Sequence, residues 1–223
     1  MRVSACIATR GDVNMKPILD TIPEEWEVIV WNNGERRVEV RRPGARFRAL
    51  LQGSIADLGP HGRFAAIHVA THNLIYVQDD DVLVSDPQAI VDAWVDEADR
   101  IFELAFEYGE STDHESEHLV ANMPPEFRPH YPDSCMVGFG AAFQRDLPEL
   151  AFKKFFAAHP EMDRRDPLFL RESCRIFTTL TPRVLVDVPK TDAPYASNPN
   201  RLWKQPDHIE MRDRALAMAR AAR

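Results

Sequence analysis

A run of three adjacent aspartates, Asp79, Asp80 and Asp81, is the feature of this sequence best suited to chemistry. Neighbouring carboxylates repel one another, so a folded chain tolerates them best when they are solvated, paired with arginine or bound to a cation. Mg²⁺ and Mn²⁺ are commonly held by one or two carboxylates together with the phosphates of a substrate. A solvated loop that caps the following helix is the competing interpretation.

The residues before the aspartates bear on this choice. Leu74 to Val77 (LIYV) is a short apolar run that predicts a buried strand, and the aspartates follow it almost directly. In open α/β sheets, ligands bind beyond the carboxyl ends of the strands. The position therefore favours a ligand-binding role for Asp79 to Asp81.

The remaining apolar runs predict strands that alternate with helices. This alternation predicts one α/β domain, with a mainly parallel sheet flanked by helices and a C-terminal closing helix. One helix should begin at Asp86 and Pro87 and carry Ile90, Trp94 and Ile101 on one face. The other expected strands are 3–8, 27–31, 135–143 and 183–188, and the other expected helices are 14–22, 62–73, 148–159, 167–180 and 207–223.

Composition indicates where such a protein would work. The chain has 223 residues, enough for a single domain with its own core, and no Gly, Ser or Pro-rich stretch resembles a flexible linker. The first residues lack the apolar core of a secretory signal, and no stretch approaches a membrane span. Cys6, Cys135 and Cys174 are odd in number and far apart. We therefore expect a soluble cytoplasmic protein without disulfides or membrane contact.

Five short segments follow one another along the chain: Ala8-Thr9-Arg10, Asn32-Asn33-Gly34, Gly62-Arg63, QDDDV, and Gly138-Phe139-Gly140-Ala141 followed by Arg145. In this order they resemble the GT-A family of glycosyltransferases, in which a D-x-D motif ends a strand after two nucleotide-binding β-α units. The resemblance spans roughly residues 3–208 and implies a single GT-A-like domain over 1–223, with a nucleotide-binding half (1–84) and an acceptor and catalytic half (119–208).

The resemblance implies metal-dependent transfer of a sugar from a nucleoside-diphosphate sugar to a hydroxyl acceptor. Asp79 would contact the ribose or the metal, and Asp81 would coordinate the Mg²⁺ or Mn²⁺ that bridges the diphosphate, with Asp80 in the same donor-binding set. Such an ion neutralises charge on the departing nucleoside diphosphate. The nucleoside pocket would be lined by Thr9, Arg10 and Asn33.

Several basic residues are further candidates for the donor site. Arg63, Arg201 and Lys204 would add positive charge near the phosphates, although each also fits an ordinary surface cation. His208, in the segment RLWKQPDH, resembles the C-terminal histidine that completes the metal shell in some family members. A surface histidine is the alternative.

A transferase that inverts the sugar configuration also needs a base to remove the proton of the acceptor hydroxyl. The family usually carries this carboxylate at the start of a helix in the second half. Asp166 stands directly before Pro167, and Asp163 is a second candidate. A plain helix cap is the alternative interpretation for Asp166. The family's Glu-Asp pair is absent, so the base and the stereochemical outcome stay open.

Charge is distributed unevenly, and this bears on the acceptor. Residues 76–118 hold fourteen acidic side chains and one arginine, and we interpret 86–117 as an exposed helix followed by a solvated loop. Residues 36–48 hold six arginines and one glutamate. If these arginines face the site, they suit an anionic acceptor such as a modified nucleic acid or a phosphorylated glycan. If they pair with the acidic face, a neutral glycan or small molecule is favoured.

Other classes fit the motifs less well. A haloacid-dehalogenase-like phosphatase also places D-x-D after a strand, but normally after the first strand. The chain has no P-loop, and His68 and His72 lack the glutamate of an H-E-x-x-H zinc motif. A non-catalytic nucleotide-sugar binding module remains an alternative from a different class.

Overall fold

The chain opens with the β-α-β unit that its apolar runs predict. Strand β1 (Val3–Thr9) and strand β2 (Glu27–Asn32) flank helix α1 (Lys16–Thr21), and both strands are buried along almost their whole length. They pair in parallel, with Thr9 opposite Asn32. The computed structural model describes residues 1–34, 47–50, 57–94, 101–104, 137–186, 188, 190–192 and 205–223.

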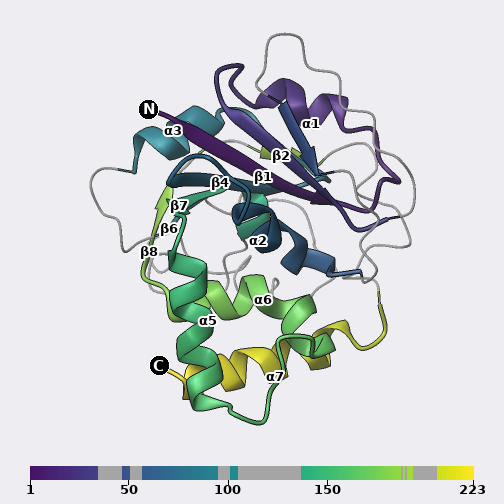
Figure 1. Ribbon diagram of the computed structural model, residues 1–223, viewed down its shortest axis with the longest axis vertical. Helices are drawn as coiled ribbons and strands as arrows, with labels where there is room; N and C mark the ends of the chain where they lie inside the picture. Colours follow the sequence, from purple (N-terminus) through teal and green to yellow (C-terminus); the bar gives the residue numbers. More distant parts are fainter. Residues whose placement is uncertain are drawn as a thin grey trace.

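Seven strands form one sheet in the order β3-β2-β1-β4-β7-β6-β8 (Figure 1). Strand β7 runs antiparallel to its neighbours β4 and β6, whereas the other neighbouring strands described in this sheet are parallel. The prediction of a mainly parallel sheet is therefore confirmed. The further strands are β3 (Phe47–Leu50), β4 (Leu74–Asp79), β6 (Ile101–Leu104), β7 (Ala141–Gln144) and β8 (Arg183–Val186).

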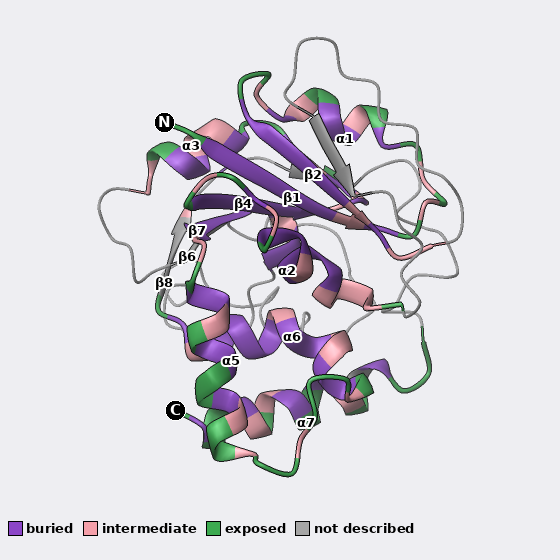
Figure 2. Cartoon of the chain, in the orientation of Figure 1, coloured by how far each residue is buried: buried purple, intermediate pink, exposed green. Residues whose placement is uncertain are grey.

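Helices cover both faces of the sheet, as the fully buried strands require. Figure 2 shows buried residues concentrated in the sheet and on the helix faces turned toward it. Helices α1 and α3 pack on one face, and α2, α5 and α6 pack on the other around Phe64, Phe152 and Phe177. Helix α7 packs against α6 and closes the chain. The bounds are α2 (Gly62–Ile67), α3 (Pro87–Asp92), α5 (Leu147–Ala158), α6 (Pro167–Leu180) and α7 (His208–Ala221).

The prediction that Ile101 continues the helix begun at Pro87 is wrong. Helix α3 ends at Asp92, and Ile101 begins strand β6, which pairs with β7 and β8 inside the main sheet. The interpretation of 86–117 as an exposed helix followed by a solvated loop is therefore wrong at residues 101–104. Short apolar runs fit a strand as well as a helix, and long-range pairing decides between them. Residues 95–100 and 105–117 lie outside the described parts.

Two other elements are shorter than predicted. The strand expected from Cys135 to Phe143 begins only at Ala141, after the 3₁₀ turn η3 (Val137–Phe139). The helix expected to reach Asn73 ends at Ile67. The Arg145 guanidinium donates to the carbonyls of His68 and Ala70, at 3.0 and 2.8 Å, and so satisfies groups that follow the helix.

The acidic run marks a corner between two sheets. Strand β4 belongs to the main sheet, but β5 (Val82–Val84) pairs antiparallel with β9 (Lys190–Asp192) in a separate ribbon. Asp80 and Asp81 form the turn between β4 and β5. The chain therefore leaves the main sheet at the aspartates.

Two expectations about composition can be compared with the structure. Within the residues that the structure describes, no helix combines the length and the apolar character needed to cross a membrane. Cys6 and Cys174 are free thiols, and Cys135 lies outside the described residues.

Candidate active site at the carboxyl edge of the sheet

The parallel register brings the predicted site residues to one edge of the sheet. Ala8 in β1 lies opposite Asp79 in β4, and Thr9 lies opposite Asn32 in β2. The backbone N–H of Asn33 also donates to the carbonyl of Thr9 at 2.7 Å. The ends of β1, β2 and β4 therefore meet where ligands bind in open α/β sheets.

The three aspartates differ in their surroundings. Asp79 is the last residue of β4 and is partly buried, Asp80 is 6% exposed, and Asp81 is partly buried. Gly138 of η3 lies directly against the Asp79 carboxylate, because a Cβ added there would lie 2.0 Å from Oδ2. A glycine is therefore needed at position 138 for this approach.

Arg63 binds Asp79 in a largely buried ion pair. The Arg63 side chain is 5% exposed, and its Nη2 donates to Oδ1 of Asp79 while its Nε donates to the carbonyl of Pro60 at 3.1 Å. Burial acts to lower the pKa of Arg63, but the adjacent Asp79 carboxylate raises it above its ordinary value. Nη1 is buried and has no hydrogen-bond partner within the described residues. The guanidinium therefore stays charged and fixes the orientation of Asp79.

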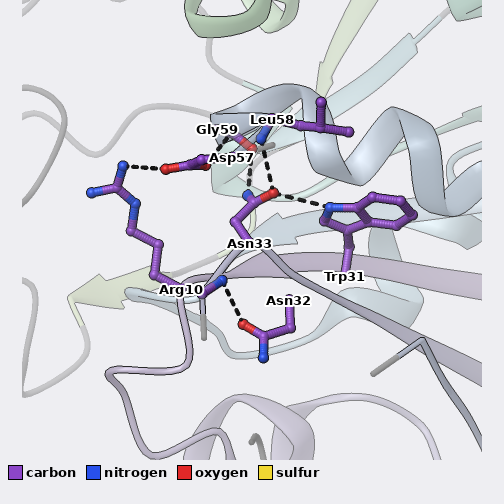
Figure 3. Close-up of polar contacts among 8 residues, drawn as sticks. Arg10, Trp31, Asn32, Asn33, Asp57, Leu58 and Gly59 are labelled. Atoms are coloured by element: carbon purple, nitrogen blue, oxygen red, sulfur yellow. Dashed lines mark hydrogen bonds and ion pairs between the residues drawn. The ribbon is translucent and has the colours of Figure 1, made fainter. Parts of the chain in front are cut away.

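Asn33 clamps the segment that leads into α2 (Figure 3). Its Nδ2 donates to the carbonyl of Gly59 at 2.8 Å, and its Oδ1 accepts from the backbone N–H of Leu58 at 3.2 Å. The indole N–H of Trp31 donates to the same Oδ1 at 3.0 Å. Since Pro60 holds Arg63, Asn33 supports the Arg63–Asp79 pair indirectly.

Arg10 and Thr9 lie beside this clamp. Nη2 of Arg10 donates to Oδ2 of Asp57 at 2.6 Å, and the two side chains are 52% and 42% exposed (Figure 3). Such an exposed pair contributes little to stability, so an anionic ligand can compete for the arginine. Thr9 is buried, and its Oγ1 accepts from the backbone N–H of Gly11 at 3.1 Å.

The two candidate bases stand at the start of α6. Oδ1 of Asp166 accepts from the backbone N–H of Leu168 at 2.8 Å, so Asp166 caps the helix. Oδ1 of Asp163 accepts from the backbone N–H of Arg165 at 2.7 Å. Each contact uses one oxygen of a carboxylate that has two, so capping and proton transfer are compatible.

His208 lies in a buried ionic cluster between α6 and α7. Its Nδ1 is 3.9 Å from Oε1 of Glu172, and Nε of Arg212 is 3.9 Å from Oε2 of Glu172. Burial raises the pKa of Glu172, although Arg212 and Arg175 oppose the shift. The role of His208 as a metal ligand stays a prediction. Arg201, Lys204 and most of the arginine-rich run 36–48 lie outside the described residues.

The carboxylates at the strand end suit a divalent ion that arrives with a diphosphate. In the described parts of the chain, no three His, Cys, Asp or Glu side chains are grouped so that they could hold a metal ion. Asp79 binds Arg63, and Asp81 is the partly buried carboxylate of the neighbouring turn that the family resemblance assigns to the metal. Mg²⁺ and Mn²⁺ are often held by one or two carboxylates plus substrate phosphates. The residues therefore fit an ion shared with a nucleotide.

The chain forms one α/β domain with a mainly parallel sheet, flanking helices and a C-terminal helix, and it shares this fold with GT-A glycosyltransferases of known structure. This confirms the fold predicted from the sequence. It also disfavours the phosphatase alternative, because the D-x-D run follows β4 rather than the first strand.

Two solved structures illustrate this likeness. TarS residues 1–349 from S. aureus, in complex with UDP, has a TM-score of 0.53 and 12% identity, covering 98% of this chain and 65% of that one. Glucosyl-3-phosphoglycerate synthase from Mycobacterium tuberculosis, in complex with Mn²⁺, UDP-glucose and phosphoglyceric acid, has a TM-score of 0.51 and 14% identity, covering 99% and 79%. No family model and no curated protein matches the sequence. The likeness therefore shows the fold.

Three features of the site were not predicted from the sequence. These are the contact of Asp57 with Arg10, the fit of Gly138 against Asp79, and the burial of Glu172 beside His208. The turn sequence Asp57-Leu58-Gly59-Pro60 was an available signal for a fixed loop. The other two features depend on helix and strand packing, which no local pattern encodes.

Proposed function

We propose that this protein is a metal-dependent glycosyltransferase that moves a sugar from a nucleoside-diphosphate sugar to a hydroxyl acceptor. The observation that carries the proposal is the parallel register of β1, β2 and β4, which gathers Arg10, Asn33 and Asp79 at one edge of a GT-A-like sheet. The two similar structures support it, since both contain UDP or a UDP-sugar and one also contains Mn²⁺.

The nucleoside and phosphates of the donor are assigned to the ends of these strands. Thr9, Arg10 and Asn33 line the nucleoside pocket, with Asn33 acting through the segment that it clamps. Arg63 offers Nη1, a buried donor without a hydrogen-bond partner among the described residues, next to Asp79. A buried donor of this kind gains from a charged acceptor such as a phosphate oxygen. Arg201 is a further predicted phosphate ligand.

Asp81 would hold Mg²⁺ or Mn²⁺ together with the diphosphate, and Asp79 and His208 are the other predicted ligands. When bound, the ion neutralises the charge that develops on the departing nucleoside diphosphate. The protein contributes a fixed strand end, because Arg63 and Gly138 hold the Asp79 carboxylate from two sides. Asp80 completes the turn between these two carboxylates.

Asp166 is the proposed base for the acceptor hydroxyl, and Asp163 is the alternative. The capping bond to Leu168 fixes Oδ1 of Asp166, so the second oxygen keeps a defined direction for accepting a proton. The acceptor is a hydroxyl compound, either a glycan or a small molecule, or a modified nucleic acid if the arginine-rich run 36–48 contributes. We propose that the reaction takes place in the cytoplasm.

Release of nucleoside diphosphate tests the proposal. The wild-type protein would be incubated with UDP-, GDP-, CDP- and dTDP-sugars, with Mn²⁺ and a panel of hydroxyl acceptors, and one donor class should be consumed. Asp166→Asn should lower kcat by about 10²-fold or more while the affinity for the donor stays nearly unchanged.

Asp146→Asn is the matched control, because Asp146 is exposed and stands before α5, another helix with a proline in its first turn. Its turnover should equal that of the wild type. Normal turnover in Asp166→Asn combined with loss in Asp163→Asn would move the base to Asp163. Metal-dependent binding of a nucleotide-sugar without any turnover would favour the binding module instead.

A further inference from the structure

Gln78 is a fully buried polar side chain just before the acidic turn. It is 0% exposed, and it lies in β4 between Val77 and Asp79. Its Oε1 accepts from the hydroxyl of Tyr76 at 2.8 Å, and its Nε2 donates to the carbonyl of Val82 at 3.1 Å. The amide therefore joins the two sides of the turn that contains Asp79, Asp80 and Asp81.

The Gln78 amide lies at a corner between two sheets. Strand β4 lies in the main sheet and β5 in the separate ribbon with β9, so a shared ladder of backbone hydrogen bonds does not join them. The Gln78 side chain provides a link across the corner from residue 78 to residue 82. A buried amide is stable only when its polar atoms are bonded, so the two contacts also fix the rotamer of Gln78.

The partner of Gln78 is itself fixed. Tyr76 is fully buried, and its hydroxyl lies close to Gly140, where an added Cβ would be 3.1 Å away. Gly140 has a φ of 108°, a conformation that side-chain-bearing residues rarely adopt. Gly140, which has no Cβ, therefore leaves room for the Tyr76 hydroxyl. The bridge from Tyr76 through Gln78 to Val82 rests on rigid elements at both ends.

We propose that Gln78 is a positioning residue that sets the geometry of the Asp79–Asp81 turn for binding of a divalent ion with a nucleoside diphosphate. This inference rests on the proposed function. Residues that orient metal ligands without touching the metal often affect metal affinity by about 10–100-fold. Gln78 acts on the backbone that carries the ligands rather than on their side chains.

The test compares Gln78→Met with the wild-type protein. Methionine is similar in length but lacks the amide. UDP would be titrated calorimetrically in Mn²⁺ and again in excess EDTA, and free Mn²⁺ would be followed by electron paramagnetic resonance in the presence of UDP. We expect Mn²⁺ affinity to fall about tenfold or more, with UDP affinity in EDTA unchanged. Loss of stability alone would not change the Mn²⁺-dependent part selectively.

Two further variants keep the test decisive. Tyr76→Phe removes only the hydroxyl that donates to Oε1 of Gln78. It should lower Mn²⁺ affinity, by a smaller factor than Gln78→Met does. If Gln78→Met does not fold, Tyr76→Phe takes its place in the test. Gln88→Met makes the same chemical change on α3, where Gln88 binds Asp92 at an exposed site, and should match the wild type.

Wild-type Mn²⁺ affinity in a folded Gln78→Met protein would overturn the inference and leave the proposed function intact. If Gln78→Met does not fold, wild-type affinity in Tyr76→Phe would overturn it. An equal loss of UDP affinity in Mn²⁺ and in EDTA would also overturn it, because that pattern indicates general disruption. If the wild-type protein itself binds UDP and other nucleoside diphosphates without any gain from Mn²⁺, the proposed function fails first.

Discussion

Removal of Asp79 should destabilise the fold more than removal of the arginine that binds it. The Arg63 side chain is 5% exposed and the Asp79 side chain is 24% exposed, so water can reach only one partner well. Asp79→Asn leaves a buried guanidinium without its carboxylate, and breaking a buried pair in this way costs about 3–5 kcal/mol. Arg63→Met keeps much of the apolar stem and leaves a carboxylate that water reaches, so we expect about 1.5–3 kcal/mol.

This difference matters for any activity measured on Asp79 variants. In domains of this size, each kcal/mol lowers Tm by about 2–4 °C, so Asp79→Asn should melt roughly 6–20 °C below the wild type. An inactive Asp79 variant therefore does not by itself show that Asp79 binds ribose or metal. The Arg63–Asp79 pair does not include Asp81, so an Asp81 variant leaves this pair in place, and its stability is to be measured beside its binding.

Urea unfolding followed by circular dichroism would measure the two single variants and the double variant. Because Arg63 and Asp79 are in contact, the loss in the double variant should be smaller than the sum of the single losses by about 0.5–3 kcal/mol. A loss below about 1 kcal/mol in Asp79→Asn, or single losses that simply add, would refute the ion pair as a determinant of stability.

Three other changes give separate expectations. Burial lowers the pKa of His61 to about 4, so between about pH 6.5 and 4 the unfolded state binds more protons than the folded state. The free energy of unfolding should therefore decrease as the pH is lowered through that window. Acid titration of unfolding should show this for the wild type, and His61→Phe should flatten it. Asn33→Asp removes the donor to Gly59, so affinity for UDP and CDP should fall by the same factor in calorimetry; unequal factors would mean that Asn33 reads the base. Gly138→Ala places a Cβ 2.0 Å from Oδ2 of Asp79 and should lower both Tm and UDP affinity, and a variant with wild-type values for both would contradict the packing described for Asp79.

Much of the fold could be predicted because local patterns and long-range packing agree in the first half of the chain. The apolar runs around β1, β2 and β4 are continuous, as fully buried parallel strands require, and the aspartates mark the end of β4. Ile101 shows where this agreement ends. Its segment carries too few residues to distinguish helix from strand, and pairing with β7 and β8 decides its structure.

The candidate site could likewise be predicted only in part. The location of Asp79, Asp80 and Asp81 at the ligand-binding end of a strand could be predicted, because an apolar run followed by carboxylates is a local signal. The commitment of Asp79 to Arg63 could not, because it depends on how α2 packs under the strand end. The role proposed for Gln78 has no local signal in the sequence either, since its hydrogen bond to Val82 spans the corner between two sheets.

Calorimetric titration of nucleoside diphosphates tests the central claim most directly. UDP, GDP, CDP and dTDP would each be titrated into the wild-type protein, Asp81→Asn and the exposed control Asp92→Asn, in Mn²⁺ and in excess EDTA. At least one nucleotide should bind the wild type and Asp92→Asn in Mn²⁺, and bind about tenfold or more weakly in EDTA or in Asp81→Asn, a difference of about 1.4 kcal/mol or more. Absence of binding by all four nucleotides, or binding indifferent to both EDTA and Asp81→Asn, would contradict the claim.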